Sequence, residues 1–154
     1  MPTGTYTLLL HLPADTRLTI GGLGQFDFPA GYYAYVDGAY DAGGLAGALK
    51  KRLTPSKTPI RHIDYLRQVA DIEEIWLTTA PHTREHVWSA LLLEIPGAMS
   101  LIEGFGATDC ACESHLIYFD VRPSLEDFVI GAKRRLPDDV IIRAYEKGGN
   151  GATR

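Results

Sequence analysis

Apolar residues recur along the chain with two different periods, and these periods predict its strands and helices. Thr5 to Leu10 is a short run of β-formers and aliphatics that ends before Pro13, and Tyr32 to Val36 alternates with a period of two. Residues 45–53 instead carry apolar side chains at helical spacing. The pattern predicts strands over residues 5–10, 17–20, 25–28, 32–36, 72–79 and 115–120, the last of the chain, and helices over residues 45–53, 62–70 and 124–135, with a further helix after an N-cap at Thr83.

The mixture of strands and helices predicts the fold class. Short connections between them indicate an α/β (α+β) fold in which a small mixed or antiparallel sheet is flanked by helices. A chain of 154 residues that is 45% hydrophobic can bury one core, so residues 1–147 are predicted to form a single domain. The Gly-rich residues 148–154 are predicted to be a disordered tail, and residues 96–114 an irregular loop.

Composition narrows the setting in which the protein works. No signal-peptide pattern opens the chain, and no apolar run approaches the roughly 20 residues that span a bilayer, so no membrane association is expected. The two cysteines, Cys110 and Cys112, are separated by one residue, a spacing that seldom supports a structural disulfide. A reducing compartment, and hence a cytoplasmic location, is therefore expected.

The distribution of charge leaves two interpretations open. A formal charge of −4 argues against a surface that binds nucleic acid everywhere, although a local basic face remains compatible with it. One basic cluster falls on the end of the predicted first helix and the loop after it. It is either a solvated helix end, where cations complement the helix dipole, or a patch that binds phosphate; its members are Lys50, Lys51, Arg52, Lys57 and Arg61.

Five short motifs follow one another in the order found in one known family. They are Gly4-Thr5-Tyr6, Tyr35-Val36-Asp37, Gly43-Gly44-Leu45, His62-Ile63-Asp64-Tyr65-Leu66 and the long string from Gly104 to Leu116. Over residues 4–120 the chain thereby resembles the GIY-YIG endonuclease superfamily, in its compact, Uri-type archaeal and bacterial branch. A lone GxY motif has little weight, whereas the Gly104 to Leu116 string is highly specific.

The resemblance implies hydrolysis of phosphodiester bonds in nucleic acid, with DNA as the expected partner and Mg²⁺ or Mn²⁺ as the cofactor. It places Tyr6 and Tyr35 in proton transfer, with His62 as a titratable group beside them. A guanidinium that contacts phosphate and a carboxylate that binds a hard cation complete such a site. The sequence points to no protein partner.

Two side chains depart from this pattern. The family arginine would stand at Ala48, and Arg52, one turn later on the same helical face, is its nearest substitute. The metal-binding glutamate would stand at Val87, and Glu85, two residues earlier, is the candidate Mg²⁺ ligand. Two hypotheses follow: a divergent, divalent-cation-dependent endonuclease, or an inactive pseudo-nuclease that binds nucleic acid.

A third hypothesis rests on a separate set of residues. Cys110, Cys112 and His115 lie within six residues, and His86 lies upstream, so together they offer the nitrogen and sulfur ligands of a tetrahedral Zn²⁺ site. This set predicts a zinc-dependent hydrolase or a redox-sensing domain. The alternative is a pair of buried thiols beside a hydrogen-bonded histidine.

Overall fold

Four strands and two helices open the chain, and strands then alternate with helices, in the computed structural model, which describes residues 2–55, 57–106 and 114–147. The strands are β1 (Gly4–Leu12), β2 (Thr16–Ile20), β3 (Gly24–Phe28), β4 (Gly31–Ala39), β5 (Asp71–Thr78), β6 (Leu116–Phe119) and β7 (Ile142–Glu146). The helices are α1 (Gly44–Leu53), α2 (His62–Arg67), α3 (Glu85–Leu93) and α4 (Leu125–Arg135). The predicted α+β class is confirmed.

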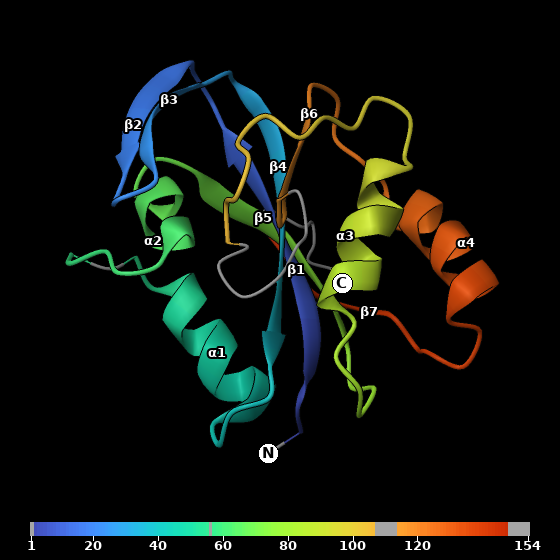
Figure 1. The fold of residues 1–154 in the computed structure, drawn as a ribbon. Helices are drawn as coiled ribbons and strands as arrows, with labels where there is room; N and C mark the ends of the chain where they lie inside the picture. Colours follow the sequence, from blue (N-terminus) through green and yellow to red (C-terminus); the bar gives the residue numbers. More distant parts are fainter. Residues whose placement is uncertain (1, 56, 107–113, 148–154) are drawn as a thin grey trace.

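The central sheet has the strand order β6-β4-β1-β5-β7, and all its neighbouring strands run antiparallel. Strands β2 and β3 form a separate hairpin, which lies over α2 (Figure 1). Helices α1 and α2 cover one face of the sheet, while α3 and α4 cover the other (Figure 1). The result is a layer of strands between two layers of helices.

Each face of the sheet has its own core, because neighbouring strand residues point to opposite faces. On the α1 and α2 side, Tyr6, Leu8 and Tyr35 belong to one buried cluster. On the α3 and α4 side, Trp88 packs edge-on against Phe128, with ring centroids 4.9 Å apart. Both cores are predominantly apolar, as burial on two faces requires.

Two predictions about secondary structure were wrong. The strand over residues 115–120 is not the last, because β7 follows α4 and adds to the free edge of β5. Arg84, and not Thr83, is the N-cap of α3, and no side chain caps that end. The predicted start of α4 is confirmed, since Ser124 accepts a hydrogen bond from the backbone amide of Asp127 at 3.1 Å.

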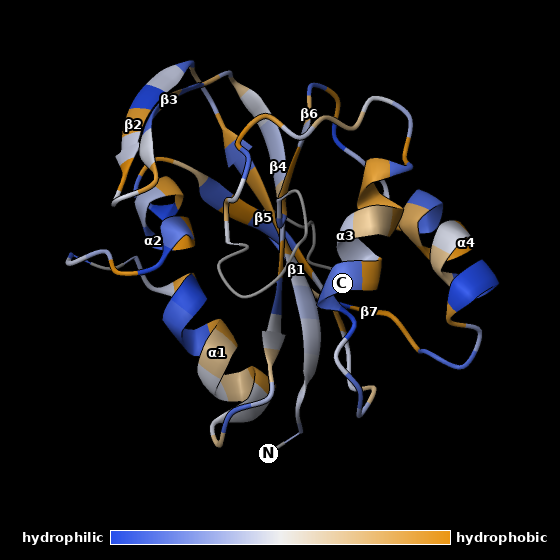
Figure 2. Ribbon diagram, viewed as in Figure 1, coloured by the Kyte–Doolittle hydropathy of each residue, from blue (hydrophilic) through white to orange (hydrophobic). Residues whose placement is uncertain are grey.

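Hydrophilic residues gather at the carboxyl-terminal turns of α1 and α4, which are basic in both helices (Figure 2). Cations at these ends complement the helix dipole. None of the helices in the described ranges has both the length and the apolar character needed to cross a membrane. The predicted tail, residues 148–154, lies outside the described residues.

Candidate active site

The β1–β4 register brings both motif tyrosines to one face of the sheet. Tyr6 lies opposite Asp37, and Leu8 lies opposite Tyr35. Because side chains two residues apart in a strand share a face, Tyr35 and Asp37 point the same way as Tyr6. The sequence thus places two phenols and one carboxyl group on the face that α1 and α2 cover.

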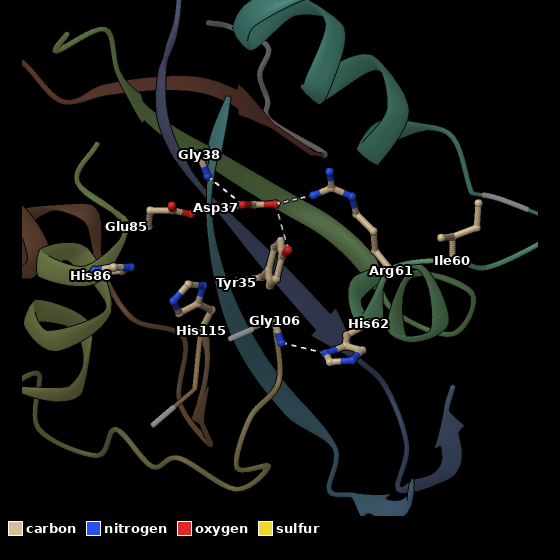
Figure 3. Close-up of a pocket in the computed structure, with 10 residues that line it drawn as sticks. All are labelled: Tyr35, Asp37, Gly38, Ile60, Arg61, His62, Glu85, His86, Gly106 and His115. Atoms are coloured by element: carbon tan, nitrogen blue, oxygen red, sulfur yellow. Dashed lines mark hydrogen bonds and ion pairs between the residues drawn. The ribbon is translucent and has the colours of Figure 1, made fainter. Parts of the chain in front are cut away.

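The Asp37 carboxyl group is bound by three neighbouring residues on this face of the sheet (Figure 3). Its Oδ2 accepts a hydrogen bond from the Tyr35 hydroxyl at 2.9 Å and pairs with the Arg61 guanidinium at 3.1 Å. Its Oδ1 accepts from the backbone amide of Gly38 at 2.8 Å. A carboxyl group held by three donors has a fixed orientation.

A cavity of about 440 Å³ opens beside Asp37. Its walls come from β4, from the starts of α2 and α3, and from two loop positions in front of β6 (Figure 3). Polar side chains from distant parts of the sequence therefore converge on one space. The lining residues are Tyr35, Asp37, Gly38, Ile60, Arg61, His62, Glu85, His86, Gly106 and His115.

Glu85, the first residue of α3, faces Asp37 across this cavity. Burial raises the pKa of the Glu85 carboxyl group, and the neighbouring charge of Asp37 and a hydrogen bond with that side chain raise it further. The Glu85 side chain also lies close to β4, since a Cβ at Gly38 would be 3.4 Å from Cδ of Glu85. Two carboxyl groups in hydrogen-bond contact either share a proton or share a cation.

The histidines of the cavity are held in different ways. Nδ1 of His62 accepts a hydrogen bond from the Gly106 backbone amide at 2.8 Å, so the neutral ring carries its proton on Nε2. Burial lowers the pKa of His62. Burial also lowers the pKa of His115, against the opposing effect of the Asp37 charge. Both rings are thereby favoured in the neutral form at neutral pH.

Tyr6 and Arg52 lie behind the cavity rather than on its wall. Tyr6 is 1% exposed and Arg52 is 7% exposed. Burial and the Asp37 charge raise the pKa of Tyr6, while a hydrogen bond with the Arg52 side chain opposes the increase. Arg52 also pairs with Asp64, with 3.3 Å between NH1 and Oδ1. Both side chains line a smaller hollow of about 130 Å³ that meets the cavity at Gly38 and Arg61.

Asp64 connects the buried Arg52 with residues that line the cavity. Its Oδ2 accepts hydrogen bonds from the backbone amides of Ile60 and Arg61, each at 3.0 Å. These bonds fix the residues that lead into α2, in a capping-box arrangement. The position of Arg61 beside Asp37 therefore depends on Asp64.

A family model for the domain of unknown function DUF123 matches residues 5–137. The chain belongs to the DUF123 family. The match contains all the lining residues of the cavity and ends just after α4, so β7 lies outside it. No curated protein and no solved structure matches the chain.

The residues predicted from sequence fall into four groups in this DUF123 protein. Tyr35, Arg61, His62, Glu85, His86 and His115 line the cavity. Tyr6, Lys51 and Arg52 line the smaller hollow. Lys50 and Lys57 are exposed and line neither space, and Cys110 and Cys112 lie outside the described residues.

The described part of the predicted zinc set is incomplete. The rings of His86 and His115 lie 5.9 Å apart, so two of its members are neighbours. Within residues 2–55, 57–106 and 114–147, no three His, Cys, Asp or Glu side chains are arranged to hold one metal ion. A structural Zn²⁺ site normally has four protein ligands, so the described residues alone do not make one.

Asp37 is a candidate site residue that was not predicted from the sequence. The available signal was its position two residues after Tyr35 in a predicted strand, which puts a carboxyl group on the same face as the phenol. A charged residue on the covered face of a strand is uncommon unless it is paired, and this one is paired with Arg61.

Proposed function

We propose that this DUF123 protein is a GIY-YIG-type nuclease that binds nucleic acid, with DNA as the expected substrate, and hydrolyses a phosphodiester bond with a divalent cation in the cavity. The observation that carries the proposal is the meeting of the Asp37 and Glu85 carboxyl groups beside the Arg61 guanidinium. The sequence resemblance separately supports phosphodiester hydrolysis. Its most specific part is the string from Gly104 to Leu116.

The described side chains fit Mg²⁺ or Mn²⁺ better than Zn²⁺. Mg²⁺ is commonly held by one or two carboxylates and completes its coordination with water and substrate phosphate, so a set of three protein ligands is not needed. Asp37 and Glu85 provide such a pair, and the cation would replace the proton that the raised pKa of Glu85 favours. Bound there, it would supply Lewis-acid neutralisation of charge on the phosphate oxygens.

The other polar side chains of the cavity are assigned separate roles in the proposed hydrolysis. Arg61 is half exposed at the cavity and is the guanidinium available to phosphate oxygens. His62 offers the N–H of Nε2 as a donor, because its Nδ1 is occupied by Gly106. His115, whose pKa burial lowers, is the neutral imidazole assigned to accept a proton from water. Tyr35 stays protonated, since burial raises its pKa, and orients Asp37.

The experiment is a cleavage assay on purified protein with plasmid, branched and single-stranded DNA and with RNA, in the presence of Mg²⁺ or Mn²⁺. Glu85→Gln is expected to lower the cleavage rate about 100-fold, the scale for loss of one electrostatic group in a site. Glu94→Gln is the matched control, because Glu94 follows the end of the same helix, is exposed and pairs with Arg135. Equal rates for both variants would remove Glu85 from the site.

A second candidate is a protein that binds nucleic acid without cutting it. The observation in its favour is that Tyr6 and Arg52 are absent from the lining of the cavity. It is supported if no substrate is cleaved but binding persists and weakens steeply as salt is raised. If there is neither cleavage nor salt-sensitive binding to any nucleic acid, both candidates fail.

A further inference from the structure

Helix α3 begins without the side-chain cap that usually fixes the start of a helix. Its N-cap residue is Arg84, and no side chain bonds to the amides of its first turn. Its first residue, Glu85, has its carboxyl group in contact with that of Asp37 (Figure 3). An uncapped helix end frays readily, and two adjacent carboxyl groups repel each other when both are ionised. Another contact must therefore hold Glu85 at the cavity.

Arg84 is held at three points. Its guanidinium pairs with both carboxylate oxygens of Asp139, with Nε 3.0 Å from Oδ2 and NH2 3.3 Å from Oδ1. Its backbone amide donates to the hydroxyl of the buried Thr5 at 3.0 Å, and its carbonyl accepts the Trp88 amide at 2.7 Å. The residue next to Glu85 is thereby joined to β1, to the first turn of α3 and to the segment that follows α4.

The Asp139 carboxylate is largely shielded from water, since its side chain is 5% exposed. It lies in a turn after α4, where its own backbone amide donates to the Leu136 carbonyl at 3.1 Å. A two-bonded arginine–carboxylate pair fixes direction as well as distance. Asp139 lies beyond the DUF123 match, which ends at residue 137. The segment after the matched domain therefore takes part in holding the start of α3.

We propose that Arg84 and Asp139 are positioning residues: their ion pair holds the start of α3 so that the Glu85 carboxylate can share a divalent cation with Asp37. This inference rests on the proposed function and adds two residues to it. Neither side chain lines the cavity, so both act through Glu85. Removal of a group that orients a metal ligand from behind typically weakens metal binding about 10–100-fold.

Binding of Mn²⁺ alone, followed by electron paramagnetic resonance, tests the proposal through two opposite changes of charge. Asp139→Asn removes a negative charge, and Arg84→Met removes a positive one. If these residues acted only through their charges, the first variant would bind Mn²⁺ more weakly and the second more tightly. Positioning predicts about tenfold weaker binding in both variants. The double variant should show no further loss, because the two side chains act as one unit.

Glu94→Gln is the matched control, because Glu94 pairs with Arg135 and joins the opposite end of α3 to the end of α4. This pair is exposed, so the control should bind Mn²⁺ within about twofold of the wild type. Arg84→Lys, which keeps the charge but loses the two-bonded geometry, replaces Arg84→Met if that variant does not fold, and it should also bind more weakly than the wild type. Tighter binding in Arg84→Met, unchanged binding in both single variants, or an equal loss in Glu94→Gln overturns the proposal.

Amide hydrogen exchange separates this proposal from the proposed function. The Trp88 amide donates to the Arg84 carbonyl, so its exchange rate reports the opening of the first turn of α3. That rate should rise about tenfold in Asp139→Asn and stay near the wild-type rate in Glu94→Gln. If the wild type binds no Mn²⁺ but exchange rises in this way, the proposed cation site fails and the positioning of Glu85 stands. An unchanged Trp88 rate in Asp139→Asn overturns the proposal, whether or not Mn²⁺ binds.

Discussion

Removal of the Asp64 carboxylate tests how the site is supported. Asp64 is the ion-pair partner of Arg52, at 3.3 Å, and its other oxygen accepts the amides of Ile60 and Arg61. The Asp64 side chain is 15% exposed and that of Arg52 is 7% exposed, so the pair is largely shielded from water. Asp64→Asn removes the charge but keeps an oxygen for the amides, whereas Asp64→Ala removes both.

The expected loss follows from burial. Breaking a buried ion pair by removing one partner costs about 3–5 kcal/mol, because the remaining charge is left uncompensated. Arg52 keeps its contact with Tyr6, so the lower end, about 3 kcal/mol, is expected for Asp64→Asn. Asp64→Ala should cost about 1 kcal/mol more, the usual value of a lost cap. Against a typical stability of about 5–15 kcal/mol, either change is large.

Urea unfolding followed by circular dichroism measures these losses. With a slope of about 1.5–3 kcal/mol per M, a loss of about 3 kcal/mol moves the midpoint by about 1–2 M. The double variant Arg52→Met/Asp64→Asn should recover at least half of the loss, because no unpaired buried charge remains. Asp27→Asn is the control: its ion pair with Arg17 is exposed, and the midpoint should stay near that of the wild type. A loss below about 1 kcal/mol for Asp64→Asn, or strict additivity in the double variant, would refute the reasoning.

Two further predictions concern packing and pH. Gly4→Ala should destabilise the protein by about 3 kcal/mol in the same urea assay, because the new Cβ would lie 1.9 Å from the Thr78 carbonyl oxygen; a loss under about 1 kcal/mol would contradict this. The folded-state pKa of His62 is lowered from 6.5, so below that pH the unfolded chain binds the proton more readily and stability falls as pH drops. His115 acts in the same direction and Glu85, with its raised pKa, in the opposite one. The test is the difference in unfolding free energy between pH 7.5 and 5.5, which should show a smaller acid-induced loss in His62→Gln than in the wild type; an equal loss would exclude His62 as a contributor.

The strands that the sequence predicted are those whose side chains are buried on one or two faces. β1 and β4 combine aliphatic and aromatic residues with strand spacing, and both lie in the centre of the sheet. β7 was missed because all five of its residues are exposed, so no hydrophobic period marks it. It is held by backbone pairing to β5 and by contacts such as Arg143 with Glu74 at 3.5 Å. Such pairing depends on a partner almost 70 residues away, which local patterns do not reveal.

The glycine of the first motif has a structural reason that its sequence context could not show. β1 runs so close to the end of β5 that any side chain at Gly4 would strike the Thr78 carbonyl. The tyrosine two residues later is then fixed by the register of β1 with β4. The glycine of the Gly4-Thr5-Tyr6 motif is therefore explained by a backbone contact, independently of any chemical role of the tyrosine.

The contacts in the structure change the interpretation of two motif positions, Ala48 and Asp37. The GIY-YIG resemblance implies an arginine at the position of Ala48, yet an arginine there would enter a hollow already lined by Arg52 and Arg61. Asp37, the last residue of the second motif, supplies the carboxylate with which Arg61 pairs, 24 residues later in the chain. The cavity therefore contains a phenol, a guanidinium and a carboxyl pair, from Tyr35, Arg61 and Asp37 with Glu85. Arg61 lines the same hollow as Ala48, so the absence of an arginine at that position does not by itself predict the absence of a guanidinium from the site.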